Sequence, residues 1–191
     1  MTEVSIFRSF NRVVENLAVE KVIEQIRSGK YKVEIEFLRE CLANGENDVY
    51  TAHKKKLPAF TPSGTFSGGR KPDFLVKYSG MVILDIDHII NGDLALIRQK
   101  AIDEPLTFAL FTSPGGNGLK ILIRVNSDKE HHLKAFEQVK FHYEKLLGLE
   151  IDRTGKDITR LCFLSYDPEA WINPNSGIGI YPCFRVIGQK A

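Results

Sequence analysis

A short apolar stretch that ends in two aspartates constrains the fold of this chain more than any other segment. Residues 81–87 read Met-Val-Ile-Leu-Asp-Ile-Asp. Four consecutive apolar residues are typical of a buried, central strand. Because side chains alternate along a strand, Asp85 and Asp87 are predicted to lie on the same face at its end. Two carboxylates roughly 6–7 Å apart on one pleat repel, and burying them costs several kcal/mol each unless a cation lies between them.

The cation that suits such a pair is Mg²⁺ or Mn²⁺, because both ions prefer carboxylate oxygen and water as ligands. The segment therefore indicates a metal site at the edge of a sheet. The alternative is that Asp85 begins a turn and that water solvates both carboxylates. The strand alone does not decide between these two interpretations.

Composition limits the class of protein. The chain has 191 residues, of which 43% are hydrophobic and 26% charged, as in a soluble globular protein with one sizeable core. The net charge of +2 predicts no global attraction to nucleic acid, so basic clusters must be judged locally. Cys41, Cys162 and Cys183 are scattered, which indicates reduced thiols in a cytoplasmic protein. We expect no secretory signal and no membrane-spanning segment.

The pattern of apolar residues predicts an α+β fold. Strands are expected at about 4–7, 74–78, 81–87, 107–111, 119–125, 158–165 and 178–186. Helices are expected at about 19–28, 33–43, 93–102 after an Asn91 cap, and 128–147 after a Ser127 cap. This order favours a mixed or antiparallel sheet over a doubly wound βαβ chain. Residues 1–50 are predicted to be a helical flank packed on a core of residues 51–191, together one compact unit.

A basic, glycine-rich segment lies between residues 54 and 71. Its five cations are Lys54, Lys55, Lys56, Arg70 and Lys71. Two phenylalanines, Phe60 and Phe66, lie among them. Cations interleaved with aromatic rings suit a surface that binds the backbone of a DNA template or primer. The alternative is a solvated surface loop.

A second glycine-rich segment forms the tip of the predicted hairpin between residues 107 and 125. Residues 113–120 read Ser-Pro-Gly-Gly-Asn-Gly-Leu-Lys. Glycine lets backbone N–H groups approach an anion, and such nests hold phosphates. The candidate phosphate-binding residues are Ser113, Gly115, Gly116, Gly118, Lys120 and, further along the chain, Arg160. A nucleoside triphosphate with a divalent metal would satisfy the aspartates and this tip together, although the tip by itself is more often a plain turn.

These motifs together resemble the catalytic core of the archaeo-eukaryotic primase-polymerase superfamily. In that core a strand ending in Asp-x-Asp is followed by a Ser-x-x-Gly-x-Gly hairpin and then by a hydrophobic-Asp pair. The chain is similar in particular to the VirE N-terminal-like domain, a primase-like family usually found ahead of a helicase-like region. The resemblance covers residues 54–173, including the segments 84–87, 112–116, 157–161 and 165–168. It implies an RRM-like antiparallel sheet with flanking helices and metal-dependent nucleotidyl transfer on a template.

The resemblance also implies roles for single residues. Asp85, Asp87 and Asp152 match the catalytic, metal-binding carboxylates, and Asp157 is a rival for the third position. Lys120 stands where many primases have a phosphate-contacting histidine; lysine binds phosphate as a permanent charge but does not reproduce the imidazole. Arg160 either clamps a phosphate or pairs with Asp157.

Three functions stay open at this point. The leading expectation is a DNA primase/polymerase-like nucleotidyltransferase that uses nucleoside triphosphates and acts in DNA replication of a mobile or phage-like element, with a helicase as partner. The second is the same fold without the chemistry, a nucleic-acid-binding accessory domain. The third, a haloacid-dehalogenase-type phosphatase with a DxD strand, is disfavoured by His88 after the motif and by the helices ahead of it. Without a visible zinc-knuckle or helicase motif, the chain is expected to be one domain of a longer protein or a degenerate copy.

Overall fold

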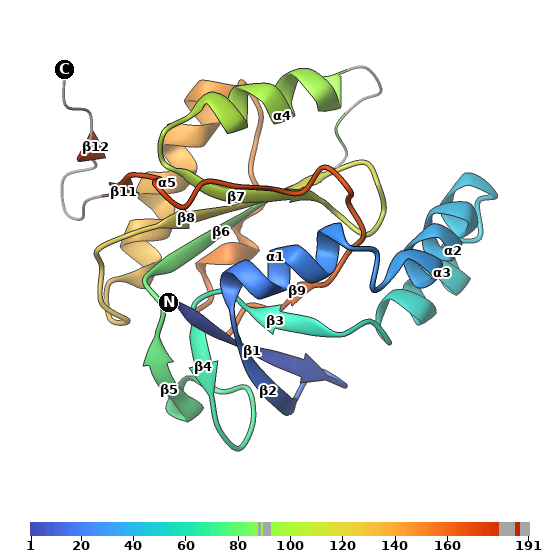
Figure 1. Cartoon of the computed structure of the whole chain (residues 1–191), viewed down its shortest axis with the longest axis horizontal. Coiled ribbons are helices and arrows are strands. Elements are labelled where there is room, and N and C mark those ends of the chain that lie inside the picture. The colour runs from blue at the N-terminus through green and yellow to red at the C-terminus, as the bar shows by residue number, and fades with distance from the viewer. Residues whose placement is uncertain (88, 90–92, 180–185, 188–191) are drawn as a thin grey trace.

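The computed structural model describes residues 1–87, 89, 93–179 and 186–187. Two four-stranded sheets lie one above the other, and two helices cover the outer face of the upper sheet (Figure 1). Every strand pair inside these two sheets is antiparallel. The described residues thus form a mixed α+β fold with antiparallel sheets and five α-helices, which confirms the predicted class.

The upper sheet contains the strand that leads to the two aspartates. Its order is β10 (Trp171–Ile172), β7 (Thr107–Thr112), β8 (Leu119–Arg124) and β6 (Met81–Ile86). The hairpin of β7 and β8 is present as predicted. The prediction that residues 81–86 form a central strand was wrong, because β6 lies at the edge of the sheet. Its six residues are nevertheless buried, since the turn that follows residue 151 covers the open edge.

Alternation along β6 divides its side chains between two cores. Val82, Leu84 and Ile86 face α4 (Asp93–Asp103) and α5 (His132–Leu147), the two helices above the sheet. Met81 and Ile83 face the lower sheet. The lower face of β6 is therefore the face on which the side chain of residue 85 also lies.

The lower sheet is built from both ends of the chain. Its order is β2 (Arg12–Ala18), β1 (Glu3–Arg8), β3 (Ala59–Thr61) and β9 (Cys162–Phe163). Helix α1 (Val19–Arg27) packs in the core between the two sheets, through Val22, Ile23 and Ile26. The first 50 residues, predicted to be a helical flank, thus also supply two strands and part of a core.

The remaining elements surround this pair of sheets. Helices α2 (Lys32–Ala43) and α3 (Asn47–Lys54) lie to one side in Figure 1. Two small ribbons complete the described residues: β4 (Gly64–Phe66) with β5 (Leu75–Tyr78), joined through η1 (Pro72–Phe74), and β11 (Ile178–Gly179) with β12 (Val186–Ile187). No helix among the described residues is long and apolar enough to cross a lipid bilayer.

Several expected boundaries differ from the structure. Helix α5 begins at His132 instead of 128, because Ser127 hydrogen-bonds the Tyr78 hydroxyl at 3.0 Å and does not cap the helix. Residues 158–165 contain only the two-residue strand β9, because the Asp157 carboxylate accepts from the Thr159 N–H at 2.8 Å and holds a turn there. The predicted Asn91 cap and most of the strand expected at 178–186 lie outside the described residues.

Candidate active site

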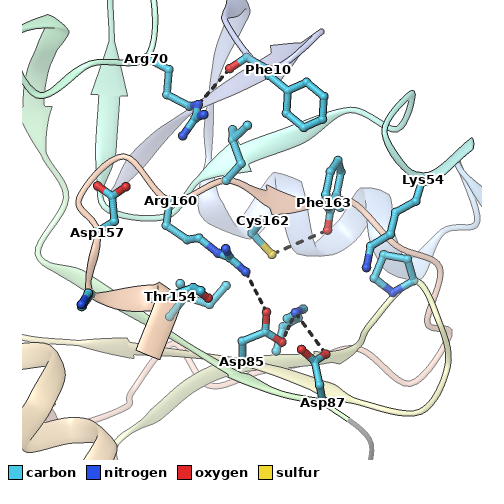
Figure 2. Close-up of a pocket in the computed structure, with 16 residues that line it drawn as sticks. Phe10, Lys54, Arg70, Asp85, Asp87, Thr154, Asp157, Arg160, Cys162 and Phe163 are labelled. Carbon is cyan, nitrogen blue, oxygen red and sulfur yellow. Dashed lines mark hydrogen bonds and ion pairs between the residues drawn. The ribbon is translucent and has the colours of Figure 1, made fainter. Parts of the chain in front are cut away.

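A cleft of about 500 Å³ lies between the two sheets, and the end of β6 forms its floor (Figure 2). We call it the acidic cleft. Its charged lining residues are Lys54, Arg70, Asp85, Asp87, Lys120, Lys156, Asp157 and Arg160. Phe10 and Phe163 line its opposite wall, on the side of the lower sheet. Carboxylates and cations from five separate segments of the chain thus meet in one cavity.

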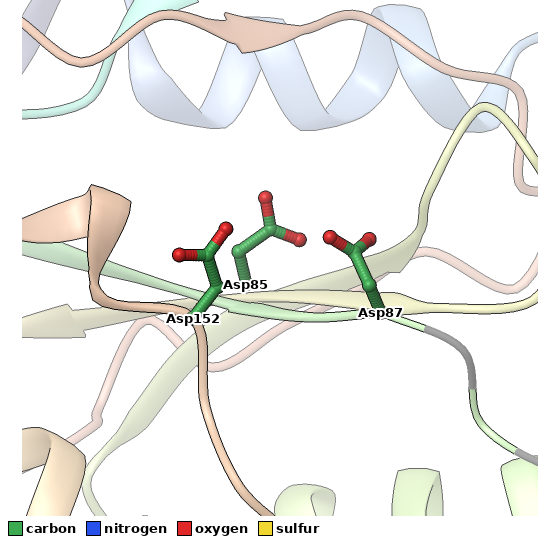
Figure 3. Close-up of side chains that lie close together, drawn as sticks. All are labelled: Asp85, Asp87 and Asp152. Atoms are coloured by element: carbon green, nitrogen blue, oxygen red, sulfur yellow. The ribbon is translucent and has the colours of Figure 1, made fainter.

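Three carboxylates converge at the acidic cleft: Asp85 and Asp87 line it, and Asp152 lies beside them (Figure 3). One carboxylate oxygen from each of Asp85, Asp87 and Asp152 lies within 4.8 Å of the others. Asp85 and Asp87 lie on one face at the end of β6, as the alternation predicted. Asp85 is buried, whereas Asp87 and Asp152 are exposed. This arrangement leaves two of the three groups open to water.

Asp152 is brought to the other two aspartates by the turn η2 (Arg153–Lys156), which covers the edge of β6. The backbone N–H of Asp152 donates to the Asp85 carbonyl at 3.1 Å, and its Oδ1 accepts from the Thr154 N–H at 2.8 Å. Gly155 lies directly against β6, where a Cβ would overlap the Ile83 carbonyl oxygen and crowd the Phe136 ring. Only glycine therefore lets this turn lie close enough to place Asp152 beside Asp85.

The structure distinguishes the two rivals for the third carboxylate. Asp157 also lines the acidic cleft, but its carboxylate accepts hydrogen bonds from the backbone and hydroxyl of Thr159 at 2.8–3.0 Å. The cluster of three close carboxylates contains Asp152 and not Asp157. On geometry, Asp152 is the third member.

Two cations neutralise Asp85. Lys120 lies opposite Asp85 in the register of β6 and β8, and its Nζ contacts Asp85 Oδ1 and lies 4.0 Å from Asp87 Oδ1. The Arg160 guanidinium, expected to clamp a phosphate or pair with Asp157, donates to Asp85 Oδ2 at 3.2 Å. An ammonium thus lies where the sequence predicted a cation between the two aspartates. Asp85 Oδ1 is buried, and its recorded polar contact is this ion pair with Lys120.

The residues present fit a divalent cation. Three carboxylates supply the hard oxygen ligands that Mg²⁺ and Mn²⁺ prefer, and the exposure of Asp87 and Asp152 admits the waters these ions retain. Because Lys120 contacts Oδ1 of Asp85, the ion and the ammonium would compete for this carboxylate.

The glycine-rich tip packs against helices. Gly115 lies near the Tyr50 hydroxyl, and Gly116, at φ +84°, lies against the Arg39 side chain, whose Nη2 donates to the Tyr166 carbonyl at 2.9 Å. A Cβ on Gly118 would overlap the Ile86 carbonyl oxygen. Within the tip, Pro114 lines the acidic cleft. The glycines therefore have packing roles, and phosphate binding by Ser113, Gly115, Gly116 and Gly118 stays a prediction.

The basic segment is divided between two cavities. Lys54 and Arg70 line the acidic cleft, whereas Lys55 and Lys56 line a neighbouring groove, and Lys71 lines neither. The Arg70 guanidinium also donates to two backbone carbonyls, those of Phe10 at 3.0 Å and Thr159 at 2.7 Å. The prediction that Phe60 and Phe66 belong to a nucleic-acid-binding surface was wrong. Both are core residues, 0% and 2% exposed, so neither ring can stack on a base.

Sequence reasoning missed several residues that line the acidic cleft, notably Phe10, Thr154, Lys156, Cys162 and Phe163. Phe10 lies in a hairpin turn that no glycine or proline marks. The Gly155 of η2 was a usable signal, since a glycine inside a short turn after Asp152 indicates a close approach of backbones. Complete burial raises the pKa of the Cys162 thiol to about 12, so this thiol is no nucleophile at neutral pH.

Comparison with known proteins gives a family. The family model described as BT4734-like, N-terminal domain, matches residues 52–171, and the chain belongs to this family. No curated protein and no solved structure matches the chain. The matched residues include all three clustered carboxylates together with Lys120 and Arg160.

Proposed function

We propose that this domain is a metal-dependent nucleotidyltransferase of the DNA primase/polymerase type, related to VirE N-terminal-like domains and to the archaeo-eukaryotic primase-polymerase superfamily. The observation that carries the proposal is the convergence of Asp85, Asp87 and Asp152 to within 4.8 Å, beside a cleft that Asp85, Asp87 and several cations line. Carboxylates beside cations suit a reaction on a charged phosphate ester.

In the proposed reaction a primer 3′-hydroxyl attacks the α-phosphate of a nucleoside triphosphate, and pyrophosphate leaves. Asp85, Asp87 and Asp152 would hold Mg²⁺ or Mn²⁺. When bound, this metal supplies positive charge that activates the hydroxyl and stabilises the transferred phosphate. The buried position of Asp85 strengthens these interactions, because electrostatic forces act over a lower dielectric there.

Lys120 and Arg160 are proposed to bind the triphosphate. Both now pair with Asp85, and an ion on the carboxylates would release them for phosphate oxygens of the incoming nucleotide. Lysine and arginine suit this role because both keep their charge at neutral pH. Lys54, across the acidic cleft, adds positive charge that would attract the backbone of a template or primer.

The arrangement of the upper sheet also supports the proposal. Its lower face carries Asp85 and Asp87 and its upper face packs against α4 and α5, so one face of an antiparallel sheet is available for chemistry, as the proposal requires. The place of this activity in replication of a mobile or phage-like element, beside a helicase, rests on the resemblance alone.

The test is Mn²⁺-dependent incorporation of labelled nucleotide on primed and unprimed DNA templates. The wild type should extend a primer or synthesise one, and Asp85→Ala/Asp87→Ala should incorporate nothing above background. Asp157→Asn is the matched control, because Asp157 lines the same cleft but lies outside the carboxylate cluster. Absence of any incorporation by the wild type, with both metals and all templates, would contradict the proposal.

A second candidate, an accessory domain that binds nucleic acid without chemistry, is favoured by one observation. Asp85 is already neutralised by Lys120 and Arg160, so the site is stable without a metal. In that case the wild type would bind DNA, and the double aspartate variant would bind it equally well.

A further inference from the structure

A second cavity, of about 880 Å³, lies beside the acidic cleft. It runs between the tip of the β1–β2 hairpin and the surface of α2 and α3. Its lining includes the rings of Phe10, Phe37 and His53 and the cations Arg8, Lys55 and Lys56. We call it the aromatic groove. No element among the described residues fills it, and Val33 and Phe37 in its wall are 78% and 41% exposed.

The aromatic groove and the acidic cleft share Phe10. On the cleft side, the Phe10 ring packs edge-on against Phe163, with ring centroids 6.0 Å apart. On the groove side, Phe37 and His53 form a second ring pair at 4.9 Å. Aromatic rings therefore follow one another from the acidic cleft into the aromatic groove.

Positive charge follows the same path. Arg70 and Lys54 line the acidic cleft, and Arg8, Lys55 and Lys56 line the aromatic groove. The groove has a single acidic lining residue, Glu34. A succession of rings flanked by cations suits a single nucleic-acid strand, whose bases stack on rings and whose phosphates attract lysine and arginine.

The turn that presents Phe10 is strained. Ser9 and Phe10 both have left-handed backbone angles, with φ of +55° and +62°. Such angles are unfavourable for a bulky residue, and Asn or Gly is the usual choice in a tight hairpin turn. The Phe10 carbonyl is held by the Arg70 guanidinium at 3.0 Å, while the Phe10 side chain stays 38% exposed. An exposed ring kept at a strained position between two cavities points to a ligand that contacts it.

We propose that the aromatic groove binds single-stranded DNA that continues from the acidic cleft, with bases on Phe10 and Phe37 and phosphates on Lys55 and Lys56. Only the continuation into the cleft rests on the proposed function. About half of the lining residues are apolar, and exposed rings in a groove suit unpaired bases better than the stacked bases of a duplex. The excess of cations disfavours a purely apolar protein segment as the occupant.

The test is fluorescence anisotropy of a labelled oligothymidine, in EDTA and without nucleotide, so that binding is separate from catalysis. Phe10→Ala and Phe37→Ala should each raise Kd about fivefold or more, because a stacked base is lost. Lys55→Ala/Lys56→Ala should reduce the slope of log Kd against log salt by about 1.4, or roughly 0.7 per lost phosphate contact. Both lysines are exposed, so this variant keeps the test valid even if Phe10→Ala fails to fold.

Two control variants remove an exposed phenylalanine and a pair of exposed lysines that lie outside both cavities. Phe141, 59% exposed on α5, lines neither cavity, and Lys100 and Lys134 are exposed on α4 and α5. Phe141→Ala and Lys100→Ala/Lys134→Ala should bind like the wild type. Groove variants that bind no more weakly than these controls would overturn the proposal, as would tighter binding of a duplex or equal binding of oligouridine.

The experiments distinguish a failure of the groove proposal from a failure of the proposed nucleotidyltransferase function. Oligothymidine binding in EDTA reports on the aromatic groove alone, because it requires neither metal nor nucleotide. Retained strand binding without nucleotide incorporation counts against the nucleotidyltransferase only. Incorporation together with unchanged binding in the groove variants counts against the groove only.

Discussion

Lys120 determines the charge balance of the acidic cleft at the scale of single residues. Its ammonium lies between Asp85 and Asp87, and Arg160 approaches Asp85 from the other side. A buried carboxylate without such partners would cost several kcal/mol. A divalent ion that bound here would therefore have to displace Lys120 from the same oxygen of Asp85.

Replacing Lys120 by methionine tests this displacement. Lys120→Met should lower the free energy of unfolding by roughly 2–4 kcal/mol without metal, because Asp85 then keeps only Arg160. Millimolar Mn²⁺ should raise the melting temperature of the variant by more than that of the wild type, since no ammonium competes. Melting curves recorded with EDTA and with Mn²⁺ measure both effects.

The control is Lys140→Met on α5. Lys140 is 13% exposed, close to the 11% of Lys120, and pairs with Glu144 at 2.6 Å. Its metal-induced shift should equal that of the wild type. A smaller Mn²⁺ shift in Lys120→Met than in the wild type would show that the lysine and the metal do not compete.

At the scale of elements, the turn η2 determines whether the third carboxylate reaches the site. Gly155→Ala forces a Cβ against the Ile83 carbonyl and the Phe136 ring, so η2 must move away from β6 and take Asp152 with it. We expect a loss of about 1–3 kcal/mol in stability from this overpacking. We also expect weaker Mn²⁺ binding, measured by calorimetric titration.

Gly45→Ala is the control that separates the loss of stability in Gly155→Ala from the loss of Mn²⁺ binding. Gly45 has φ +77° and open space around it, so alanine there strains the backbone without touching the site. It should lose stability and keep Mn²⁺ affinity. If Gly155→Ala also keeps full Mn²⁺ affinity, then Asp152 is no ligand.

A buried histidine connects α5 to the rest of the fold. His132 Nδ1 lies 2.9 Å from the Tyr78 hydroxyl of β5, and its Nε2 lies 3.4 Å from Ser63 Oγ. Burial lowers the pKa of His132 from its ordinary value of 6.5, because a buried imidazolium loses its hydration. Below about pH 6.5 the unfolded chain therefore binds a proton that the folded chain does not.

Stability should consequently fall as the pH decreases from about 6.5, by at most about 1.4 kcal/mol per pH unit for this one group. His132→Gln removes the titrating group, so its stability should depend less on pH between about pH 6.5 and 5. Urea unfolding at several pH values measures the difference. Parallel pH profiles for the wild type and His132→Gln would contradict the assigned direction of the pKa shift.

The sequence predicted the elements with strong periodicity and missed those without it. Alternation placed Asp85 and Asp87 on one face, and the apolar stripe of α1 fixed its position. The short helix α3 has no buried residue, so no hydrophobic period marked it. Strand β2 was missed because most of its side chains are exposed, so its residues carry no inward-facing pattern.

At the scale of the whole molecule, the acidic cleft exists only because the two sheets face each other. Phe10 and Phe163 come from the lower sheet or its hairpin turn, and Asp85 and Lys120 come from the upper sheet. The register of the β7–β8 hairpin places Lys120 opposite Phe111, whereas its pairing with Asp85 joins β6 to β8, two strands that do not follow one another in the chain. The packing of Arg39 against the glycine-rich tip likewise joins segments with no local relation, so neither contact could be counted from the sequence.

The most direct test of the central claim is a titration of the wild-type protein with Mn²⁺, in which electron paramagnetic resonance measures the free ion. We predict at least one site in the wild type, and a loss of affinity of about tenfold or more in both Asp87→Asn and Asp152→Asn. Asp48→Asn, an exposed carboxylate on α3, should bind like the wild type. Unchanged Mn²⁺ affinity in the two cluster variants would contradict the metal site and the nucleotidyl transfer that depends on it.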